Sequence, residues 1–271
     1  MQLSEIHIYP IKPRGGISRG EPRHPARGLE HDRRWMLVDV QGRFLSQRRH
    51  PLMARLQVTW EENGLLVRDC SGSRAPLPIP FQAQTEARIP VVIWNDTCEG
   101  QVVSDTADAW FSEALGQDIR LIYMPDESRR AVDPKRAQNG EIVSFADGYP
   151  CLIIGQASLD LLNEKLAQAL PMNRFRPNFV FTGGAPHAED HWASFRIGEG
   201  LFHGVKPCVR CEMTSIDQET TQRGKEPLRT LATYRRTEKG VIFGQNLLHE
   251  GSGRVKVGDW IEVLAHHNTI V

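Results

Sequence analysis

The sequence has no long apolar run of the kind that crosses a membrane. No stretch reaches the roughly 18 consecutive apolar residues that a spanning helix requires. The opening segment, MQLSEIHIYPIKPRGG, also lacks the apolar core of a secretory signal. Cysteine is scarce, with five in the chain, and an odd, low number argues against a disulfide framework. We therefore expect a cytoplasmic protein without a membrane segment.

An excess of charge of either sign is also missing. Lys and Arg total 33, as do Asp and Glu, which gives a formal net charge of zero. A sequence-independent nucleic-acid binder needs a broad basic surface, so we expect no nucleic-acid partner. A local basic cluster is still compatible with this balance. With 271 residues, 40% of them hydrophobic, the chain can bury the core of one large domain or two modest ones.

The chain does contain a succession of short strand patterns. Residues 56–60 alternate apolar and polar, and Asn63-Gly64 then supplies a tight turn before the pattern returns. Gln41-Gly42 forms a similar turn between two short strands predicted in 35–45. Residues 75–81 hold too many prolines for a central strand. Strands are predicted within 3–8, 35–45, 56–69, 91–94, 178–181, 241–244 and 255–264.

Two helices are predicted from capping residues and amphipathic spacing. Ser104 can cap the segment DTADAWFSEALG, which has an acidic first turn and ends at Gly116. Ser158 can open LDLLNEKLAQAL (159–170), with leucines along one face. The polar stretch 125–141 is predicted as a loop, either a mobile lid or a solvated connection. Mostly β structure with a few helices indicates a barrel-like or α+β architecture.

Cys208 and Cys211 stand three residues apart in PCVRC and can be explained in four ways. A redox dithiol needs the motif at the start of a helix, whereas the following EMTSID is predicted to be strand-like. A zinc site could add His187 and His191 from a predicted loop upstream. Two ordinary core residues are a third explanation, because free cysteine is often buried. A ligand for some other metal is the fourth, and spacing alone leaves all four open.

Several short segments, many of them basic, accompany this motif in a fixed order. They are YPIKPRGG (9–16), HDRRW (31–35), NRFRPNF (173–179), CVRC (208–211), KEPLRTL (225–231), FGQN (243–246) and VKVGD (255–259). Together they resemble the MOSC family, named after the C-terminal part of molybdenum-cofactor sulfurases. The branch resembled has an N-terminal MOSC β-barrel domain and includes the mitochondrial amidoxime-reducing component and the YcbX-type proteins. The resemblance implies that this domain, at 1–115, packs against a MOSC β-barrel domain at 116–267, which the first strand can join.

The resemblance also implies a pyranopterin molybdenum cofactor in a basic cleft between the domains. Cys211 matches the cysteine that binds molybdenum, and Asp147 lies where relatives place an acidic residue beside the metal, so both are candidate catalytic residues. Guanidinium groups bind phosphate through forked hydrogen bonds, and a thiolate suits a redox metal. Pro13 departs from the Ser or Thr usual in relatives and removes one backbone donor to the phosphate. The matching cofactor-binding positions are Lys12, Arg33, Arg176, Arg210 and Asn246.

Two functions follow from the resemblance. The first is a molybdenum-cofactor-dependent oxidoreductase that reduces N-hydroxylated small molecules to the N–H product and water. Five scattered cysteines cannot hold the ferredoxin cluster of YcbX-type relatives, so electrons would come from a separate partner, a ferredoxin or a reductase. The second is a carrier of sulfur or of the cofactor that uses a persulfide on Cys211. A structural zinc protein built on His187 and His191 is the remaining hypothesis.

Overall fold

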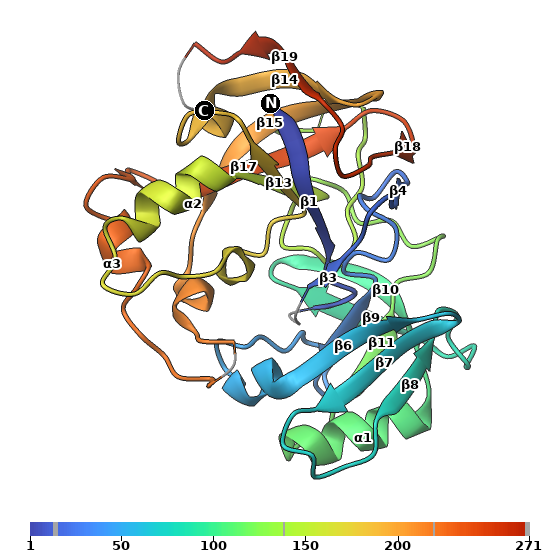
Figure 1. Ribbon diagram of the computed structural model, residues 1–271. Coiled ribbons are helices and arrows are strands. Elements are labelled where there is room, and N and C mark those ends of the chain that lie inside the picture. Colours follow the sequence, from blue (N-terminus) through green and yellow to red (C-terminus); the bar gives the residue numbers. More distant parts are fainter. Residues whose placement is uncertain (13–15, 138, 219, 269–271) are drawn as a thin grey trace.

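Strands dominate the computed structural model, which describes residues 1–12, 16–137, 139–218 and 220–268. The predicted mostly-β, α+β fold with a few helices is confirmed. A large sheet fills the upper part of the molecule in Figure 1. In spatial order its strands are β19 (Ile261–His266), β14 (Trp192–Ile197), β15 (Gly200–Val209), β17 (Gly240–His249), β12 (Cys151–Gly155), β13 (Phe179–Thr182), β1 (Gln2–Ile8) and β3 (Ile17–Ser18), with β16 (Arg236–Thr237) paired to β17.

The first strand of the chain belongs to this large sheet. β1 pairs antiparallel with β13, and Leu3 lies opposite Phe181. In Figure 1 it runs in dark blue among yellow and orange strands from the second half of the chain. The register shifts between Leu3 and Glu5, which turns Leu3 toward the core together with Ile6 and Ile8. The domain limits inferred from the sequence stay predictions.

Smaller sheets complete the fold. The proline-rich segment predicted not to be a central strand contains β8 (Leu77–Pro80), which lies at the edge of its three-stranded sheet. At an edge, the prolines do not interrupt the hydrogen bonds of a central ladder. The second strand predicted in 35–45 was wrong. Asp39 Oδ1 accepts the N–H groups of Gln41 and Arg43, and isolated bridges from Arg43 to Val92 and from Phe44 to Val38 form in its place. The strands are β2 (Ile11–Lys12), β5 (Trp35–Val38), β11 (Arg120–Tyr123), β10 (Asp96–Val102) and β9 (Arg88–Ile93) in one sheet, β6 (Leu56–Glu61), β7 (Gly64–Asp69) and β8 (Leu77–Pro80) in another, and β4 (Arg23–His24) with β18 (Gly253–Arg254).

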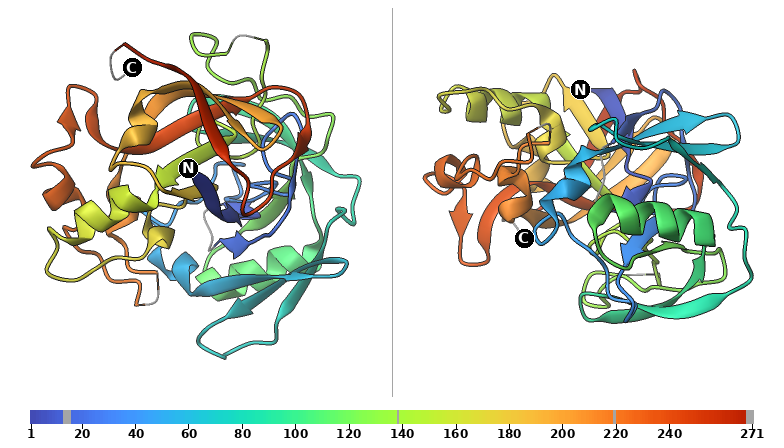
Figure 2. Two further views of the ribbon diagram at one scale, coloured as in Figure 1. Left: turned by 45° about the horizontal axis from the view of Figure 1, so that its top comes forward. Right: turned by 90° about the horizontal axis from the view of Figure 1, so that it is seen from below.

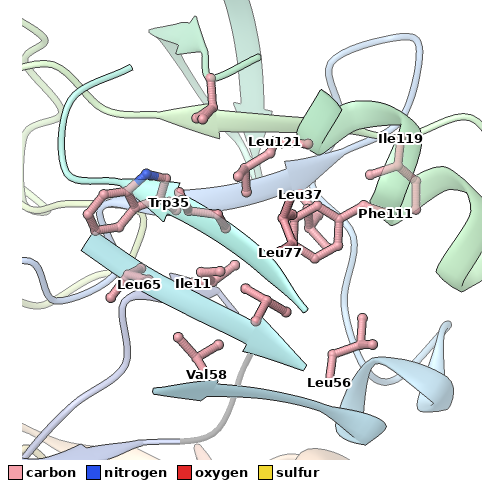
Figure 3. Close-up of a cluster of buried hydrophobic side chains, with 14 of the residues drawn as sticks. Ile11, Trp35, Leu37, Leu56, Val58, Leu65, Leu77, Phe111, Ile119 and Leu121 are labelled. Carbon is pink, nitrogen blue, oxygen red and sulfur yellow. The ribbon is translucent and has the colours of Figure 1, made fainter. Parts of the chain in front are cut away.

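The core of the N-terminal half lies between the sheet that contains β5, the sheet of β6, β7 and β8, and helix α1 (Figure 3). Trp35 and Leu37 from β5, Leu65 from β7 and Phe111 from α1 are each at most 1% exposed. Full burial of one such side chain contributes about 1.5–3 kcal/mol to the stability of the fold. β2 pairs with β5, so this packing gives Lys12 a rigid support.

Helix α1 (Asp105–Leu115) begins and ends as predicted. Ser104 Oγ accepts a hydrogen bond from the Ala107 N–H at 3.1 Å. Gly116 adopts a φ of +69°, the left-handed conformation that suits glycine after a helix. α1 lies at one end of the molecule, away from α2 (Gln156–Asn163) and α3 (Leu228–Leu231) (Figure 2). No helix in the described ranges is long and apolar enough to span a bilayer.

Helix α2 differs from its prediction at both ends. It begins after Gly155, and Ser158 cannot cap it because its buried hydroxyl donates to Glu189 Oε1 at 3.0 Å. It ends at Asn163, whose side-chain amide hydrogen-bonds both the N–H and the C=O of Leu170. These local bonds replace further helical turns. The longer helix predicted there was therefore wrong.

Short 3₁₀ helices and turns replace some predicted strands and loops. η4 (Glu212–Ser215) follows Cys211 where a strand-like segment was predicted, and Thr214 Oγ1 closes it by donating to Cys211 O at 3.0 Å. The strand predicted over 255–264 was wrong in its first part, because Lys256 and Asp259 close a turn before β19. The remaining 3₁₀ helices of the described residues are η1 (Pro51–Arg55), η2 (Met172–Arg174) and η3 (Ala188–His191), the last within a predicted loop.

Candidate functional site

A cavity of about 370 Å³ lies between the two halves of the fold. Its walls come from turns and strand ends that are far apart in the sequence, as expected for a site assembled by folding. Every residue that the sequence singled out as catalytic or cofactor-binding lines this cavity, although the roles themselves stay predictions: Lys12, Arg33, Asp147, Arg176, Arg210, Cys211 and Asn246.

The Cys211 thiol is exposed and borders the cavity. Its backbone is extended, with a φ of −116° and a ψ of 178°, and it precedes η4 at the N-cap position. Cys151, by contrast, is buried, and burial raises the pKa of its thiol well above the ordinary value. Of these two cysteines, Cys211 is the one that can bind a soft metal or carry a persulfide.

Tyr9 holds two arginines beside the cavity. Its buried ring centroid lies 4.4 Å from Arg33 Cζ and 4.5 Å from Arg176 Cζ, within the range of cation–π attraction. Arg33 is fixed further by hydrogen bonds from Nη1 to Asp32 Oδ2 at 2.5 Å and to Asn178 Oδ1 at 3.1 Å. The Tyr9 ring thus holds the positive charges of Arg33 and Arg176 close together. Two neighbouring guanidinium groups favour a bound anion between them.

Arg176 has the least compensated of these charges. In the part of the chain that the structure describes, its guanidinium forms no ion pair and no hydrogen bond to a side chain or backbone oxygen. Burial and the neighbouring Arg33 lower its pKa to about 10, so it is still charged at neutral pH. Arg33 and Arg176 also have positive φ values of 49° and 55°, an uncommon conformation for arginine that often marks functional positions.

Arg210 is anchored on two sides and leaves one donor free. Nη1 donates to Cys208 Sγ at 2.9 Å and Nη2 to Phe175 O at 2.5 Å. Within the described ranges, its buried Nε has no hydrogen-bond partner. Leaving a buried donor unsatisfied costs about 1–3 kcal/mol, and a ligand in the cavity could remove this cost. Cys208, for which the sequence suggested a core position, is half-buried and also helps to orient Arg210.

Lys12 and Asp147 form an ion pair across the cavity wall. Lys12 Nζ donates to Asp147 Oδ1 at 2.6 Å, and Trp94 Nε1 donates to the same oxygen at 3.1 Å. Burial lowers the pKa of Lys12, while Asp147 partly offsets that shift. The Asp147 side chain is largely open to solvent, and the partial loss of hydration beside the cleft raises its pKa. The Lys12 charge and both hydrogen bonds outweigh this effect and hold the pKa well below its usual range. Asp147 is therefore a carboxylate at neutral pH.

A second cavity of about 650 Å³ adjoins the first and shares Asp147 and Asn246 with it. Asn246 Nδ2 donates to Lys206 O at 3.1 Å, which fixes the side chain at the border of the two cavities. Residues 129–134 of loop 125–141 line the second cavity. Its Arg130 is buried and donates to Asp96 and to backbone oxygens, so the loop is more than a solvated connection, and its role as a mobile lid stays a hypothesis.

Several residues that line or support the cavity were missed by the sequence analysis. Tyr9 stands in the YPIKPRGG segment, but nothing in its spacing indicates that it supports two arginines. Phe44, Arg48 and Trp94 come from connecting segments of the N-terminal half. Phe44 follows the predicted Gln41-Gly42 turn and Trp94 ends the strand predicted at 91–94, but neither place indicates a site. Pro13, where one phosphate donor was expected to be missing, lies outside the described residues.

The histidines proposed for zinc do not join the cysteines. Burial and, to a lesser extent, Arg235 lower the pKa of His187 to about 4, and its ring packs near Tyr234 and Phe243. Among the described residues, no group of three or more His, Cys, Asp or Glu side chains is placed to hold a metal ion. The structure thus gives no support to the zinc hypothesis.

The backbone between the cysteines also disfavours a dithiol. β15 includes Cys208, and the Arg210 N–H continues its ladder by donating to Val241 O at 2.7 Å. At about 3.3 Å per residue, extended chain separates the Cα atoms of Cys208 and Cys211 by roughly 10 Å, beyond the roughly 7 Å that a disulfide allows. A disulfide between them would require the backbone to move.

Taken together, the fold and the cavity define a two-part β protein with a cation-lined cleft that the exposed Cys211 thiol borders. Residues 1–118 match the family described as the MOSC N-terminal beta barrel domain, and residues 140–262 match the MOSC domain. The chain belongs to the MOSC family, in the branch that combines both domains.

Relatives with assigned names align along nearly the whole chain. Mitochondrial amidoxime-reducing component 1 of Mus musculus is 30% identical over 281 residues, covering 97% of this chain and 82% of that protein. Mitochondrial amidoxime reducing component 2 of Bos taurus is 31% identical, covering 95% and 81%. Molybdenum cofactor sulfurase of Oryza sativa subsp. japonica is 30% identical over 97% of this chain, but the chain spans only 35% of that protein's length.

Proposed function

We propose that this protein binds a molybdenum cofactor in the cleft and reduces N-hydroxylated compounds with electrons from a separate protein. The observation that carries the proposal is the convergence of Arg33, Arg176, Arg210 and the exposed Cys211 on one cavity. The similarity to amidoxime-reducing components along most of both chains supports it.

The residues of the cleft fit such a cofactor. A pyranopterin carries a phosphate, and the Arg176 guanidinium and the Arg210 Nε are donors without partners among the described residues. Cys211 supplies a soft ligand for the metal, and Asn246 borders the same space. The cavity of about 370 Å³ falls within the size range of ordinary ligand sites. When bound, the cofactor would supply the two-electron redox chemistry.

The remaining chemistry belongs to Lys12 and Asp147. Conversion of an N–OH group to N–H and water consumes two electrons, which the partner protein delivers, and two protons, of which one comes from solvent and one from the chain's own residues. We infer that the Asp147 carboxylate accepts a hydrogen bond from the substrate hydroxyl and orients it. Lys12 Nζ, 2.6 Å from that carboxylate, holds a proton that can pass to the leaving water through Asp147. Burial lowers the pKa of Lys12 and so makes this proton easier to release.

The electron donor has to be another protein in this proposal. The five cysteines do not form the spacing of a ferredoxin cluster, and those that the structure describes are dispersed between core and surface. A ferredoxin or a reductase would therefore deliver the electrons at the cleft.

Metal analysis of matched cysteine variants tests the proposal. The protein is produced with molybdate in a host that makes the cofactor, and molybdenum and pterin are measured in wild type, Cys211→Ala and Cys208→Ala. We expect near-equimolar molybdenum in wild type and loss in Cys211→Ala. Cys208→Ala should have a milder effect, because it removes one contact to Arg210 and some packing but no proposed metal ligand. Equal loss in both variants would contradict the assignment of Cys211 as the ligand. Reduction of an N-hydroxylated compound by the loaded wild type, with a viologen dye as donor, is the second readout.

Sulfur or cofactor transfer is the second candidate. The accessibility of Cys211 and the similarity to about a third of the length of a molybdenum cofactor sulfurase favour it. A carrier needs a transferable sulfur on Cys211 and no turnover with N–OH compounds. Mass spectrometry of the intact protein separates the two functions, because a persulfide adds one sulfur atom that a reductant removes. A persulfide on Cys211 together with absent N–OH reduction would favour the carrier.

A further inference from the structure

Arg174 lines the cleft but has no role in the steps above. Its side chain is 7% exposed, and two of its donors are bound to oxygens of the protein itself. Nε donates to Thr214 O at 3.0 Å, and Nη1 donates to Asp217 Oδ2, also at 3.0 Å. Arg176 differs, because within the described ranges its guanidinium forms no ion pair. Arg174 is therefore suited to hold the protein, and Arg176 to hold an anion.

The hydrogen bonds of Arg174 lead through Thr214 to Cys211. Cys211 O accepts the Thr214 N–H at 3.2 Å and the Thr214 hydroxyl at 3.0 Å, which closes η4 on the cysteine. Arg174 Nε then holds the carbonyl of the same threonine. Because Arg174 is the last residue of η2, these bonds join η2 to the start of η4. The backbone of Cys211 is thus tied to a buried guanidinium.

The two residues after Arg174 contact the other arginines of the cleft. Phe175 is fully buried, and its carbonyl accepts Arg210 Nη2 at 2.5 Å. The Arg176 carbonyl accepts Arg33 Nη2 at 3.4 Å. Three consecutive residues therefore connect the segment that carries the thiol with the groups that face a bound anion.

Asp217 holds η4 from its far end. It follows η4 in a loop, where its backbone N–H donates to Gln222 O at 2.9 Å. In the same loop, Arg223 donates to Arg48 O, a backbone atom of the N-terminal half. The loop therefore spans from the Arg174 guanidinium to the opposite wall of the cleft. We call the bonds from Arg174 to Thr214 O and to Asp217 the Arg174 clamp.

We propose that Arg174 is a positioning residue, which fixes the Cys211 thiol relative to Arg33 and Arg176. This rests on the proposed function, in which the thiol binds molybdenum and the two arginines bind the phosphate of the same cofactor. One rigid ligand can satisfy both ends only if the thiol and the guanidinium groups keep their separation. A displacement of about 1 Å at a reacting centre can lower the rate about a hundredfold. The Arg174 clamp prevents such a displacement of Cys211.

Hydrogen exchange tests the clamp in the full chain without any turnover. Wild type, Arg174→Met and Arg174→Lys are compared, with Arg74→Met as the control. Arg74 is also paired, to Asp69 at 2.5 Å, but does not line the cavity. Amides in residues 211–217 should exchange about tenfold faster in Arg174→Met, the effect of losing one charge-assisted hydrogen bond. The exposed Cys211 thiol should also react faster with iodoacetamide. Arg174→Lys, which keeps the charge, should fall between the two, and Arg74→Met should match wild type.

The spectrum of the metal tests whether the clamp positions the thiol. The cofactor-loaded proteins are partly reduced, and the electron paramagnetic resonance of Mo(V) is recorded beside the pterin content. Arg174→Met should keep most of its pterin, unlike Arg176→Met, and show an altered Mo(V) signal. Arg174→Lys should restore part of the wild-type signal. Where an N–OH compound is reduced, kcat should fall about tenfold or more in Arg174→Met, with little change in KM.

A second variant covers the case in which Arg174→Met does not fold. The Asp217 side chain is 40% exposed, so Asp217→Asn removes the charge of the pair at less risk to the core. It should change the exchange rates and the Mo(V) signal in the same direction, to a smaller extent. A folded Asp217→Asn protein that matches wild type in both would then overturn the proposal.

The remaining outcomes separate this proposal from the proposed function. A wild-type Mo(V) signal in folded, loaded Arg174→Met overturns the positioning role. Loss of pterin from Arg174→Met to the level of Arg176→Met also overturns it, because Arg174 would then bind the cofactor itself. An altered signal in a protein that reduces no N–OH compound supports the positioning role and refutes the reductase. If wild type binds no molybdenum, the proposed function fails, and the iodoacetamide rate decides: a faster reaction in Arg174→Met supports the clamp, and an equal rate overturns it.

Discussion

Neutralising Asp147 should destabilise the protein through Lys12. The Lys12 side chain is 7% exposed, and its Nζ lies 2.6 Å from Asp147 Oδ1. Two unit charges at that separation attract by about 2 kcal/mol in water and about 6 kcal/mol at the effective dielectric constant of a protein surface. Because the Asp147 side chain is 77% exposed, solvent screens the pair and the lower end applies. We expect Asp147→Asn, which keeps the shape of the side chain and an acceptor oxygen, to lower the free energy of unfolding by about 1–2 kcal/mol.

A double-mutant cycle with Lys12→Met isolates this attraction. Wild type, both single variants and the double variant are unfolded with urea at pH 7 and low ionic strength. The double variant should lose about 1–2 kcal/mol less than the two single losses combined, and added salt should shrink this coupling. Additivity to within about 0.3 kcal/mol would refute the ion pair as a stabilising contact.

The same pair predicts a pH dependence with a defined sign. The pKa of Asp147 in the folded protein lies below its ordinary value of 3.8. A carboxyl of this kind stabilises the fold above its unfolded pKa, and the contribution is lost as the pH falls through the folded pKa. The stability difference between wild type and Asp147→Asn should therefore be constant between about pH 7 and pH 5 and should shrink progressively as the pH falls below about 4. A difference that persists unchanged in acid would argue against the assigned shift.

Two further predictions concern Glu189 and Arg176. Burial and, to a lesser extent, the neighbouring Asp190 raise the pKa of Glu189 to about 7 from an ordinary 4.5. Ionising Glu189 in the folded protein therefore lowers the free energy of unfolding by about 3 kcal/mol, and this loss develops as the pH rises from 4.5 toward 7. Glu189→Gln, which keeps an acceptor for Ser158, should therefore be more stable than wild type at pH 8 and lose this advantage near pH 4.5. A stability difference in urea unfolding that does not change with pH would contradict this prediction. Arg176→Met should lower cofactor retention at least tenfold, because a charge-assisted hydrogen bond contributes about 1.5–3 kcal/mol to binding. Cofactor content is measured as pterin fluorescence after oxidation. An unaltered signal would show that Arg176 does not bind the cofactor.

Much of the fold followed from the sequence because short-range patterns specify it. The cap at Ser104, the stop at Gly116 and the hairpin around Asn63-Gly64 each depend on contacts within a few residues. The family resemblance carried by the ordered segments around CVRC also implied a set of candidate site residues, and these residues line one cavity. Residue type and local order carry this information without any knowledge of the tertiary contacts.

The tertiary structure decided what depends on distant partners. Ser158 does not cap its helix because Glu189, far along the chain, accepts its hydroxyl. Tyr9 contacts the guanidinium groups of Arg33 and Arg176 because the end of β1 packs beside the segment that follows η2. Trp94 enters the cleft because Asp147, from the other half of the fold, accepts its N–H. Local spacing cannot encode such contacts, since they form only when loops that are remote in sequence close on one another.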